Sequence, residues 1–257
     1  HRRGPDNQSY LSLDCGLTLG AARLAMTDPL PRSNQPMRDL ETGNVVVFNG
    51  EIYNYKELRK NLESFAIKFI TNSDTEVLLK LLTHYGIDGI QKLQGMYAFA
   101  FYDSSKNEIV LSRDFLGKKP LYFHHSKDKF FFSSQLNQIK TYLSKVTINS
   151  RSVSTYLQLG YLFDPYTMHN EIKAIKPGEI MVIQISDISI KKTTQILPSI
   201  LYDLSDAPIS EVLNNAIKER VSEHSRFAIS LSGGIDSTLI ALQSSALGLK
   251  ASAYSAR

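Results

Sequence analysis

The chain has 257 residues, of which 42% are hydrophobic, so it exceeds one average domain and can bury a sizeable core. Its 29 basic and 25 acidic residues leave a net charge of only +4, spread without a basic run, which argues against nucleic-acid binding. One cysteine excludes an internal disulfide framework, and no signal peptide or membrane-length apolar run is visible, so we expect a cytoplasmic protein that does not bind membranes.

From the N-terminus, the chain first predicts two strands that end at polar residues. Residues 17–25 form a strand running into Arg23, and a loop rich in Asp, Pro and Asn follows over 27–37. The apolar run 45–48 is a second strand, which we expect to end at Asn49-Gly50. Because sites are usually built where elements end, both strand ends are candidates.

Two helices follow, and each begins with a capping pattern. Residues 54–64 are predicted to be helical, with Asn54 as the N-cap and Glu57 completing a capping box. The pattern recurs at Ser73–Glu76, before a helix with one apolar face. This assignment places Asp74 at the start of the second helix.

From residue 96 onward, short apolar stretches separated by turn residues predict an antiparallel sheet. We expect strands at residues 96–102, 108–112, 121–124 and 129–133, helices at 134–143 and 151–160, and a last hairpin at 180–185 and 188–192. The polar, turn-rich stretch 193–208 is the predicted inter-domain linker.

The C-terminal part predicts a strand–loop–helix–strand unit after an amphipathic helix at 209–221. Residues 227–229 end a strand, a helix begins at Thr238, and 250–256 form a second strand. One such unit cannot cover both faces of a parallel sheet, so we expect a segment to be missing at this end, and another at the N-terminus, which lacks an initiator Met.

The loop inside this unit reads SGGIDS. The amides of Gly233 and Gly234 could hold an anion at the positive end of the helix dipole, and Ser232 and Ser237 add hydroxyl donors. Asp236 offers a carboxylate to a divalent cation. No Gly-Lys-Ser/Thr follows, so a pyrophosphate leaving group fits better than γ-phosphoryl transfer. The alternative is an ordinary Ser/Gly turn before a helix, whose first turn favours an acid anyway.

A second group of polar residues lies in the first half of the chain. Arg23, Asn49, Gly50, Glu51 and Asp74 would together suit a small zwitterion such as an amino acid. Each charge-assisted bond to its carboxylate or ammonium would contribute about 1.5–3 kcal/mol, and Asn49 with the Gly50 amide could form an oxyanion hole. From these residues alone, a hairpin turn at Asn-Gly, a first-turn acid and a surface arginine remain equally good explanations.

Several colinear motifs resemble the glutamine-hydrolysing asparagine synthetase superfamily, and together they cover essentially the whole chain. The motifs are Arg3-Gly4-Pro5-Asp6, Arg23-Leu24-Ala25-Met26-Thr27-Asp28, Asn49-Gly50-Glu51-Ile52-Tyr53-Asn54, Ser73-Asp74-Thr75-Glu76-Val77, Gly95 to Ala100, Arg113 to Tyr122, and Ser232 to Ser237. The last is similar to the PP-loop, SGGxDS, of ATP pyrophosphatases.

The resemblance implies an α+β fold. Residues 1–192 would form a class II glutamine amidotransferase domain, an Ntn-hydrolase-type αββα sandwich of two antiparallel sheets. Residues 205–257 would begin a parallel α/β PP-loop ATP pyrophosphatase domain.

Site roles follow from the same resemblance. It assigns Arg23 to the α-carboxylate of glutamine, Asp74 to its α-ammonium, Asn49 and Gly50 to the oxyanion hole, and Glu51 to the glutamine site. It assigns Ser232, Gly233, Gly234, Asp236 and Ser237 to the pyrophosphate of ATP, Asp236 also to Mg²⁺, and Ala256 to the neighbourhood of the adenine.

The implied activity is ATP-dependent amide synthesis with ammonia from glutamine, and the expected acceptor is aspartate, activated as an acyl-adenylate. ATP and Mg²⁺ would be the cofactors, and the resemblance allows a homodimer. Two alternatives stay open. The acceptor could be another carboxylate, such as a sugar acid in polysaccharide synthesis, or the protein could be a non-catalytic glutamine-binding module. Met-Cys at the true start would support the enzyme.

The chain departs from the family at the nucleophile. The family uses an N-terminal cysteine whose own amino group is the base, and this residue lies upstream of the Arg3-Gly4-Pro5-Asp6 motif. It is not in these 257 residues, so we expect this polypeptide to be inactive as a glutaminase. Cys15 precedes Gly16, like the family's Cys-Gly, but it has no free amine and is expected to be a packing residue.

Overall fold

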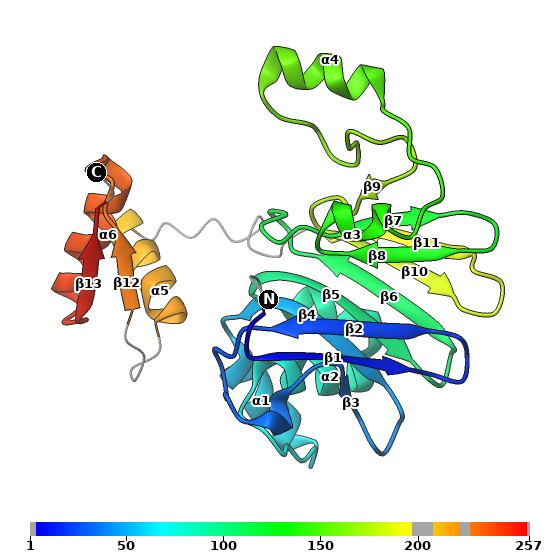
Figure 1. The fold of residues 1–257 in the computed structure, drawn as a ribbon. Helices are drawn as coiled ribbons and strands as arrows, with labels where there is room; N and C mark the ends of the chain where they lie inside the picture. The colour runs from blue at the N-terminus through cyan, green and yellow to red at the C-terminus, as the bar shows by residue number, and fades with distance from the viewer. Residues whose placement is uncertain (1–3, 197–207, 222–226, 256–257) are drawn as a thin grey trace. The chain divides into compact units, whose positions relative to one another are not determined.

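The computed structural model describes residues 4–196, 208–221 and 227–255. The chain divides into two compact units, residues 1–199 and 200–257 (Figure 1). The first unit contains β1–β11 and α1–α4, and the second contains α5, α6, β12 and β13. No helix in the described ranges is long and apolar enough to cross a membrane.

A six-stranded sheet with antiparallel neighbours organises the first unit. Its strand order is β11-β10-β6-β5-β4-β3. The strands are β3 (Met37–Arg38), β4 (Val45–Ile52), β5 (Gly95–Asp103), β6 (Glu108–Arg113), β10 (Glu179–Gln184) and β11 (Ile190–Gln195). Alternate residues of its strands point to opposite faces, and both sets belong to buried apolar clusters, so both faces of this sheet are covered.

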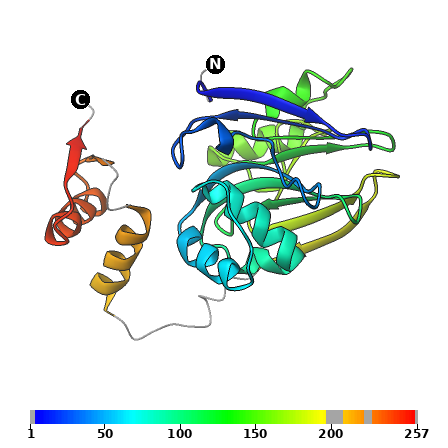
Figure 2. The same ribbon diagram turned by 90° about the horizontal axis from the view of Figure 1, so that it is seen from below.

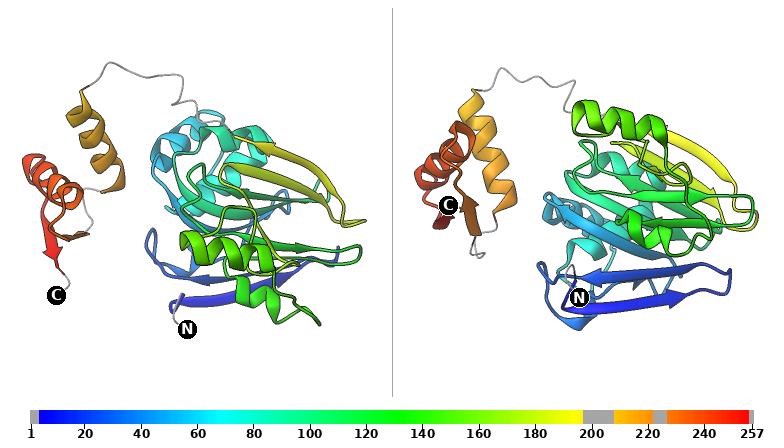
Figure 3. Two further views of the ribbon diagram at one scale, coloured as in Figure 1. Left: turned by 90° about the horizontal axis from the view of Figure 1, so that it is seen from above. Right: turned by 45° about the horizontal axis from the view of Figure 1, so that its top comes forward.

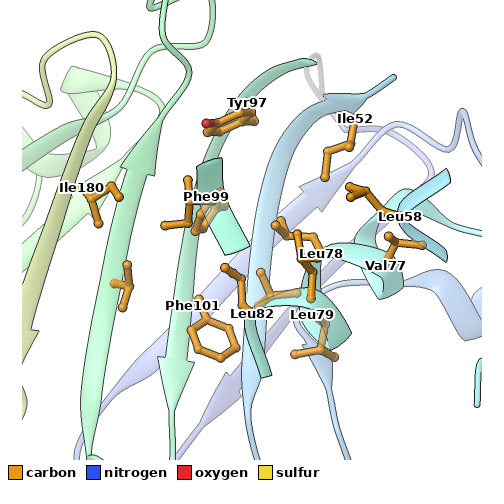
Figure 4. Packing of buried hydrophobic residues seen from close by; sticks show 14 of the residues in the cluster. Ile52, Leu58, Val77, Leu78, Leu79, Leu82, Tyr97, Phe99, Phe101 and Ile180 are labelled. Atoms are coloured by element: carbon orange, nitrogen blue, oxygen red, sulfur yellow. The ribbon is translucent and has the colours of Figure 1, made fainter. Parts of the chain in front are cut away.

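Two helices, α1 (Tyr55–Ser64) and α2 (Asp74–Tyr85), cover one face of the large sheet (Figure 2). Figure 4 shows Leu78 and Leu82 of α2 pointing toward Phe99 and Phe101 of β5. This buried cluster fixes α2 against β4 and β5, and it therefore fixes the start of α2 beside the sheet.

Short strands cover the opposite face. They form a hairpin of β1 (Asn7–Ser12) and β2 (Thr18–Arg23), and a sheet of β7 (Tyr122–His125), β8 (Phe130–Ser133) and β9 (Lys173–Ala174). Helices α3 (Leu136–Lys140) and α4 (Ser150–Leu159) lie on the same side (Figure 3). The predicted mixed α/β fold with antiparallel sheets is confirmed. Within the described residues, however, this second layer is two separate sheets rather than one.

Several predicted element bounds are wrong. The polar strand β1 has no apolar alternation and was not expected, and α3 is shorter than predicted. Asn54 is at the N-cap position of α1 as predicted, but its side chain makes no capping bond, because it donates to Lys92 O at 2.9 Å and accepts from Gln94 N at 3.1 Å. The last hairpin runs on to Gln195, inside the predicted linker, and residues 197–207 lie outside the described ranges.

The second unit contains α5 (Ile209–Arg220), β12 (Phe227–Ser230), α6 (Ile235–Ala246) and β13 (Ala251–Tyr254). Strands β12 and β13 pair in parallel, with α6 connecting them, as the sequence predicts. Helix α6 begins at Ile235, three residues before the predicted start, so Asp236 lies in its first turn. Ala256 lies outside the described residues.

Candidate functional site

The five polar residues singled out in the first unit line a single open cavity of about 1610 Å³. Strand β2 supplies Arg23, β4 supplies Asn49, Gly50 and Glu51, and α2 supplies Asp74. Single-ligand pockets usually measure roughly 300–1,000 Å³, so these residues form one part of a larger cavity wall.

The outer edge of β4 runs along this cavity wall. Strand β3 covers only the first two residues of β4, and no other strand among the described residues pairs with the rest of this edge. Phe48 N donates to Gln35 Oε1 at 2.6 Å, and Ile52 N donates to Asp74 Oδ2 at 3.2 Å. Strand alternation places the Gly50 N–H on the same edge, and no side chain or loop carbonyl in the described ranges accepts from it. This amide can therefore donate to a ligand.

Gly50 lies within a strand, not at the strand end or hairpin turn that its Asn-Gly sequence suggests. It pairs with Tyr97, and a Cβ at position 50 would lie 2.1 Å from Met96 O. A Cβ at Gly95 would lie equally close to Glu51 O. The close approach of β4 to β5 therefore requires glycine at both positions.

The side chain of Asn49 points to the opposite face of β4 from position 50. It pairs with Ala98 of β5, and its Nδ2 lies 3.5 Å from Ser134 Oγ, directly after β8. This long hydrogen bond holds the carboxamide loosely over the cavity. The Asn49 side chain and the Gly50 amide are thus successive donors along β4.

Asp74 is the first residue of α2 and is only 5% exposed. Burial raises the pKa of its carboxyl to about 6, and the negative charge of Glu51 adds to this rise, while the N–H groups of Ile52 and Thr75 partly offset it. Asp74 does lie in the first turn of α2, but its burial distinguishes it from an ordinary, solvated first-turn acid. Asp74 is a buried carboxylate that faces a cavity.

The predicted capping pattern before α2 is half correct. Ser73 caps the helix by accepting from Glu76 N at 3.2 Å. The Glu76 carboxylate does not return to Ser73, because it accepts from Ile70 N and from Thr71 N. These bonds fix the loop before α2, and they hold Asp74 in place.

Arg23 is buried, so it is not a surface charge. Its Nη1 donates to Asn34 Oδ1 at 3.1 Å and to Leu30 O at 3.4 Å. Its Nη2 donates to Thr27 O at 3.0 Å and to Asp28 O at 2.7 Å. The guanidinium therefore anchors the 27–34 loop, and a ligand carboxylate would bind through Nε or replace one of these carbonyls.

Cys15 lies in the turn between β1 and β2, at the opposite end of the hairpin from Arg23. At about 3.3 Å per residue, β2 alone separates the two ends by roughly 16 Å. Cys15 packs at the edge of the cluster that includes Leu19, which agrees with a packing role.

In the second unit, the SGGIDS loop joins the carboxyl end of β12 to α6. Ser237 Oγ donates to Gly234 O at 3.2 Å, and Ser232 Oγ accepts from Gly234 N at 3.3 Å. Gly233 has φ +84°, a conformation that favours glycine, and a Cβ there would have no atom within 4 Å. The loop is thus an exposed turn at a helix N-terminus.

The described residues contain no group of three His, Cys, Asp or Glu side chains that could hold a metal ion. Asp236 is a single carboxylate in the first turn of α6. Magnesium commonly binds one or two carboxylates together with substrate phosphates. Within the described residues the loop offers one carboxylate, so a magnesium ion here would need further oxygen ligands from a bound phosphate group.

The sequence did not reveal Asn34 and Gln35, which contact Arg23 and β4. Both lie in the 27–37 segment, whose residues show no helix or strand periodicity. The only local feature of the pair is that it directly precedes Pro36.

Comparison with known proteins gives a consistent assignment. Residues 1–194 match the family described as glutamine amidotransferase domain. Asparagine synthetase (glutamine-hydrolyzing) 1 of Bacillus subtilis is 32% identical over 243 residues, covering 93% of this chain and 38% of the relative. Putative asparagine synthetase (glutamine-hydrolyzing) 2 of Methanocaldococcus jannaschii is 33% identical over 264 residues, covering 93% of this chain and 50% of that relative.

Among solved structures, a glutamine phosphoribosylpyrophosphate amidotransferase from B. subtilis, complexed with ADP and GMP, has a TM-score of 0.48 at 18% identity, over 92% of this chain and 51% of that one. The chain spans about half or less of the length of the curated relatives it matches.

Gly50→Ala is expected to destabilise the first unit, because the new methyl group would collide with Met96 O and force β4 away from β5. Strain of this kind typically costs about 1–3 kcal/mol. Urea unfolding of the variant and the wild type measures the change. Gly20→Ala is the matched control, because a Cβ at that strand position meets its nearest atom at 3.8 Å. Equal stability of the Gly50 and Gly20 variants would show that the close approach does not constrain the fold.

Asp74→Asn is expected to stabilise the ligand-free protein at neutral pH. The folded-state pKa of about 6 lies above the usual 3.8, so stability falls as pH rises from about 4 to 6, and the full cost persists above that window. Asparagine cannot ionise, so the variant avoids this cost. Each kcal/mol gained raises Tm by about 2–4 °C for a chain of this size.

Thermal unfolding at pH 7.5 and at pH 4.5 tests this expectation. The gain should be present at pH 7.5 and small at pH 4.5, where the wild-type carboxyl is mostly protonated. A variant that melts below the wild type at pH 7.5 would contradict the assigned burial cost.

Proposed function

The chain belongs to the glutamine amidotransferase domain family, and from this premise we propose that its first unit binds L-glutamine as part of an enzyme that uses glutamine as an ammonia source. One observation carries the proposal. A buried carboxylate, Asp74, and a backbone donor, Gly50, lie along the same uncovered edge of β4. A ligand with an ammonium at one end and a polarised carbonyl at the other matches this pair.

In this proposal, Asp74 holds the α-ammonium of glutamine and Arg23 its α-carboxylate. The Gly50 N–H and the Asn49 carboxamide donate to the side-chain carbonyl oxygen, which becomes negative as the amide is attacked. Removing one such donor typically costs about 2.7–4 kcal/mol of barrier. Glu51, beside Asp74, adds negative charge near the ammonium.

The second unit is proposed to hold the pyrophosphate of ATP. The first-turn amides of α6 have no partner within the helix and would bind the phosphates. Ser232 and Ser237 would add hydroxyl donors, and Asp236 would bind Mg²⁺. When bound, ATP would supply the adenylyl group that activates a carboxylate as an acyl-adenylate, with pyrophosphate as the leaving group.

Aspartate is the proposed acceptor in the complete protein, because the relatives named above are asparagine synthetases. A sugar acid is the alternative acceptor, and a non-catalytic glutamine-binding module is the alternative class. ATP–pyrophosphate exchange by the full-length protein, with aspartate against other acids, distinguishes the acceptors. Glutaminase activity of the full-length protein distinguishes the enzyme from the binding module.

Glutamine affinity is expected to rise with pH through about 6 and then level off, because only ionised Asp74 attracts the ammonium. Asp74→Asn should weaken binding by between about tenfold and a hundredfold, the value of one charge-assisted bond, and should remove the pH step. Isothermal titration of the 257-residue chain with L-glutamine measures both effects.

Asp187→Asn serves as the control, because it removes a carboxylate from an exposed turn of the same unit. This variant should match the wild type in affinity and in pH dependence. No binding of L-glutamine to the wild type, or equal affinity in the Asp74 variant, would refute the proposed site.

Magnesium pyrophosphate is expected to bind the wild-type chain more tightly than pyrophosphate alone. Asp236→Asn should remove most of this magnesium-dependent gain, because the only first-turn carboxylate of α6 is lost. Titration with pyrophosphate, with and without Mg²⁺, measures the difference. The same magnesium-dependent gain in the wild type and the Asp236 variant would contradict the assigned metal contact.

A further inference from the structure

Gln35 is a buried polar residue that belongs to no helix or long strand. It lies between the short 3-10 helix η1 (Pro31–Ser33) and β3, and it is 7% exposed. It lines the same cavity as Asn49 and Asp74. No role in the proposed glutamine site has been assigned to it so far.

The side chain of Gln35 connects the two elements that form the site. Its Oε1 accepts from Phe48 N at 2.6 Å, and its Nε2 donates to Thr75 Oγ1 at 3.4 Å. Phe48 directly precedes Asn49, and Thr75 directly follows Asp74. One carboxamide therefore joins β4 to the start of α2.

The chemistry of the two partners fixes the orientation of this carboxamide. A backbone N–H can only donate, so the atom that faces Phe48 must be the oxygen. The amino group then faces Thr75, where the hydroxyl oxygen accepts. The carboxamide supplies the acceptor and the donor for these two bonds, whereas a carboxylate of the same length makes the second bond only when the Thr75 hydroxyl donates to it.

The backbone around Gln35 contacts the remaining part of the site. Ser9 Oγ of β1 donates to the Gln35 carbonyl oxygen, and the preceding residue, Asn34, accepts from Arg23 Nη1 at 3.1 Å. The Asn34-Gln35 dipeptide thus contacts the β1–β2 hairpin, β4 and α2. These are the elements that carry Arg23, Gly50 and Asp74.

We infer that Gln35 is a positioning residue that sets the separation between the Gly50 amide and the Asp74 carboxylate, and so selects a ligand of glutamine's length. The inference rests on the proposed glutamine site. Gln35 does not contact the ligand, and it acts through Phe48 and Thr75. The hydrogen bond from β4 to Asp74 and the apolar cluster still hold α2 on the sheet without the two Gln35 bonds. Loss of the Gln35 bonds loosens the spacing between Phe48 and Thr75, so the two ends of the ligand meet their partners less well together.

The test compares L-glutamine with L-norvaline, which has the same α-carbon groups but a methyl group in place of the carboxamide. Norvaline would bind only through its α-carbon groups, at the Asp74 end of the site. Its affinity should therefore not depend on the separation between the Gly50 amide and the Asp74 carboxylate. Gln35→Met keeps the side-chain length and removes both hydrogen bonds. It should weaken glutamine binding by about tenfold or more and norvaline binding by less than about threefold, tenfold being the equivalent of one net hydrogen bond.

Two further variants keep the test decisive where Gln35→Met fails to fold. Gln35→Glu retains the acceptor for Phe48 N and should recover part of the glutamine preference. Thr75→Val removes only the α2 end of the connection, and it should lower the glutamine-to-norvaline ratio. Gln8→Met is the matched control, since Gln8 lines the same cavity but makes only one long bond, to Gly4 O at 3.5 Å.

Isothermal titration of the 257-residue chain gives both affinities for every variant. A reduced glutamine-to-norvaline ratio in Gln35→Met or in Thr75→Val, with the wild-type ratio in Gln8→Met, supports the inference. A wild-type ratio in both Gln35→Met and Thr75→Val overturns it, because a merely structural loss weakens both ligands equally. Absence of glutamine binding in the wild type instead overturns the proposed function itself.

Discussion

The architecture of the site follows from one constraint, the need to satisfy the buried N–H groups along the outer edge of β4. Strand β3 ends after two residues, and in the part of the chain that the structure describes no other strand pairs with the rest of this edge. Buried backbone donors left without partners are costly. The side chains of Gln35 and Asp74 accept from two of these donors, at Phe48 and Ile52. The same bonds bring a loop and a helix start against the sheet, and the uncovered edge becomes a polar cavity wall.

This solution carries a cost in stability. An ionised carboxylate at Asp74 is buried beside Glu51, and its raised pKa reports that the folded protein disfavours the charge. Glycines at positions 50 and 95 give up side-chain packing so that β4 and β5 can approach closely. The buried charge of Asp74 weakens the free protein, whereas the two glycines are what the close approach of β4 to β5 requires. A cationic group bound beside Asp74 would therefore recover part of the free energy that burying its charge costs.

Local signals in the sequence predicted local structure well and failed where a partner lies far away in the chain. Ser73 was correctly assigned as a cap because its partner is three residues away. Asn54 has the same pattern, but its side chain bonds to residues about 40 positions later. Gly50 reads as a turn, although the backbone of β5 is what requires it to be glycine. Gln35 lies in a loop without periodicity, so only the folded structure reveals its two partners.

The two proposed sites use electrostatics in opposite ways. Asp74 is buried, so its attraction for a cation is weakly screened by salt but depends strongly on its own ionisation near pH 6. The loop from Ser232 to Ser237 is largely exposed, and it would hold phosphate with backbone dipoles and hydroxyl groups that do not titrate near neutral pH. Screening over a Debye length of about 8 Å at physiological salt acts fully on such a site. In the proposed function, glutamine binding would therefore depend mainly on pH, and anion binding at the loop on ionic strength.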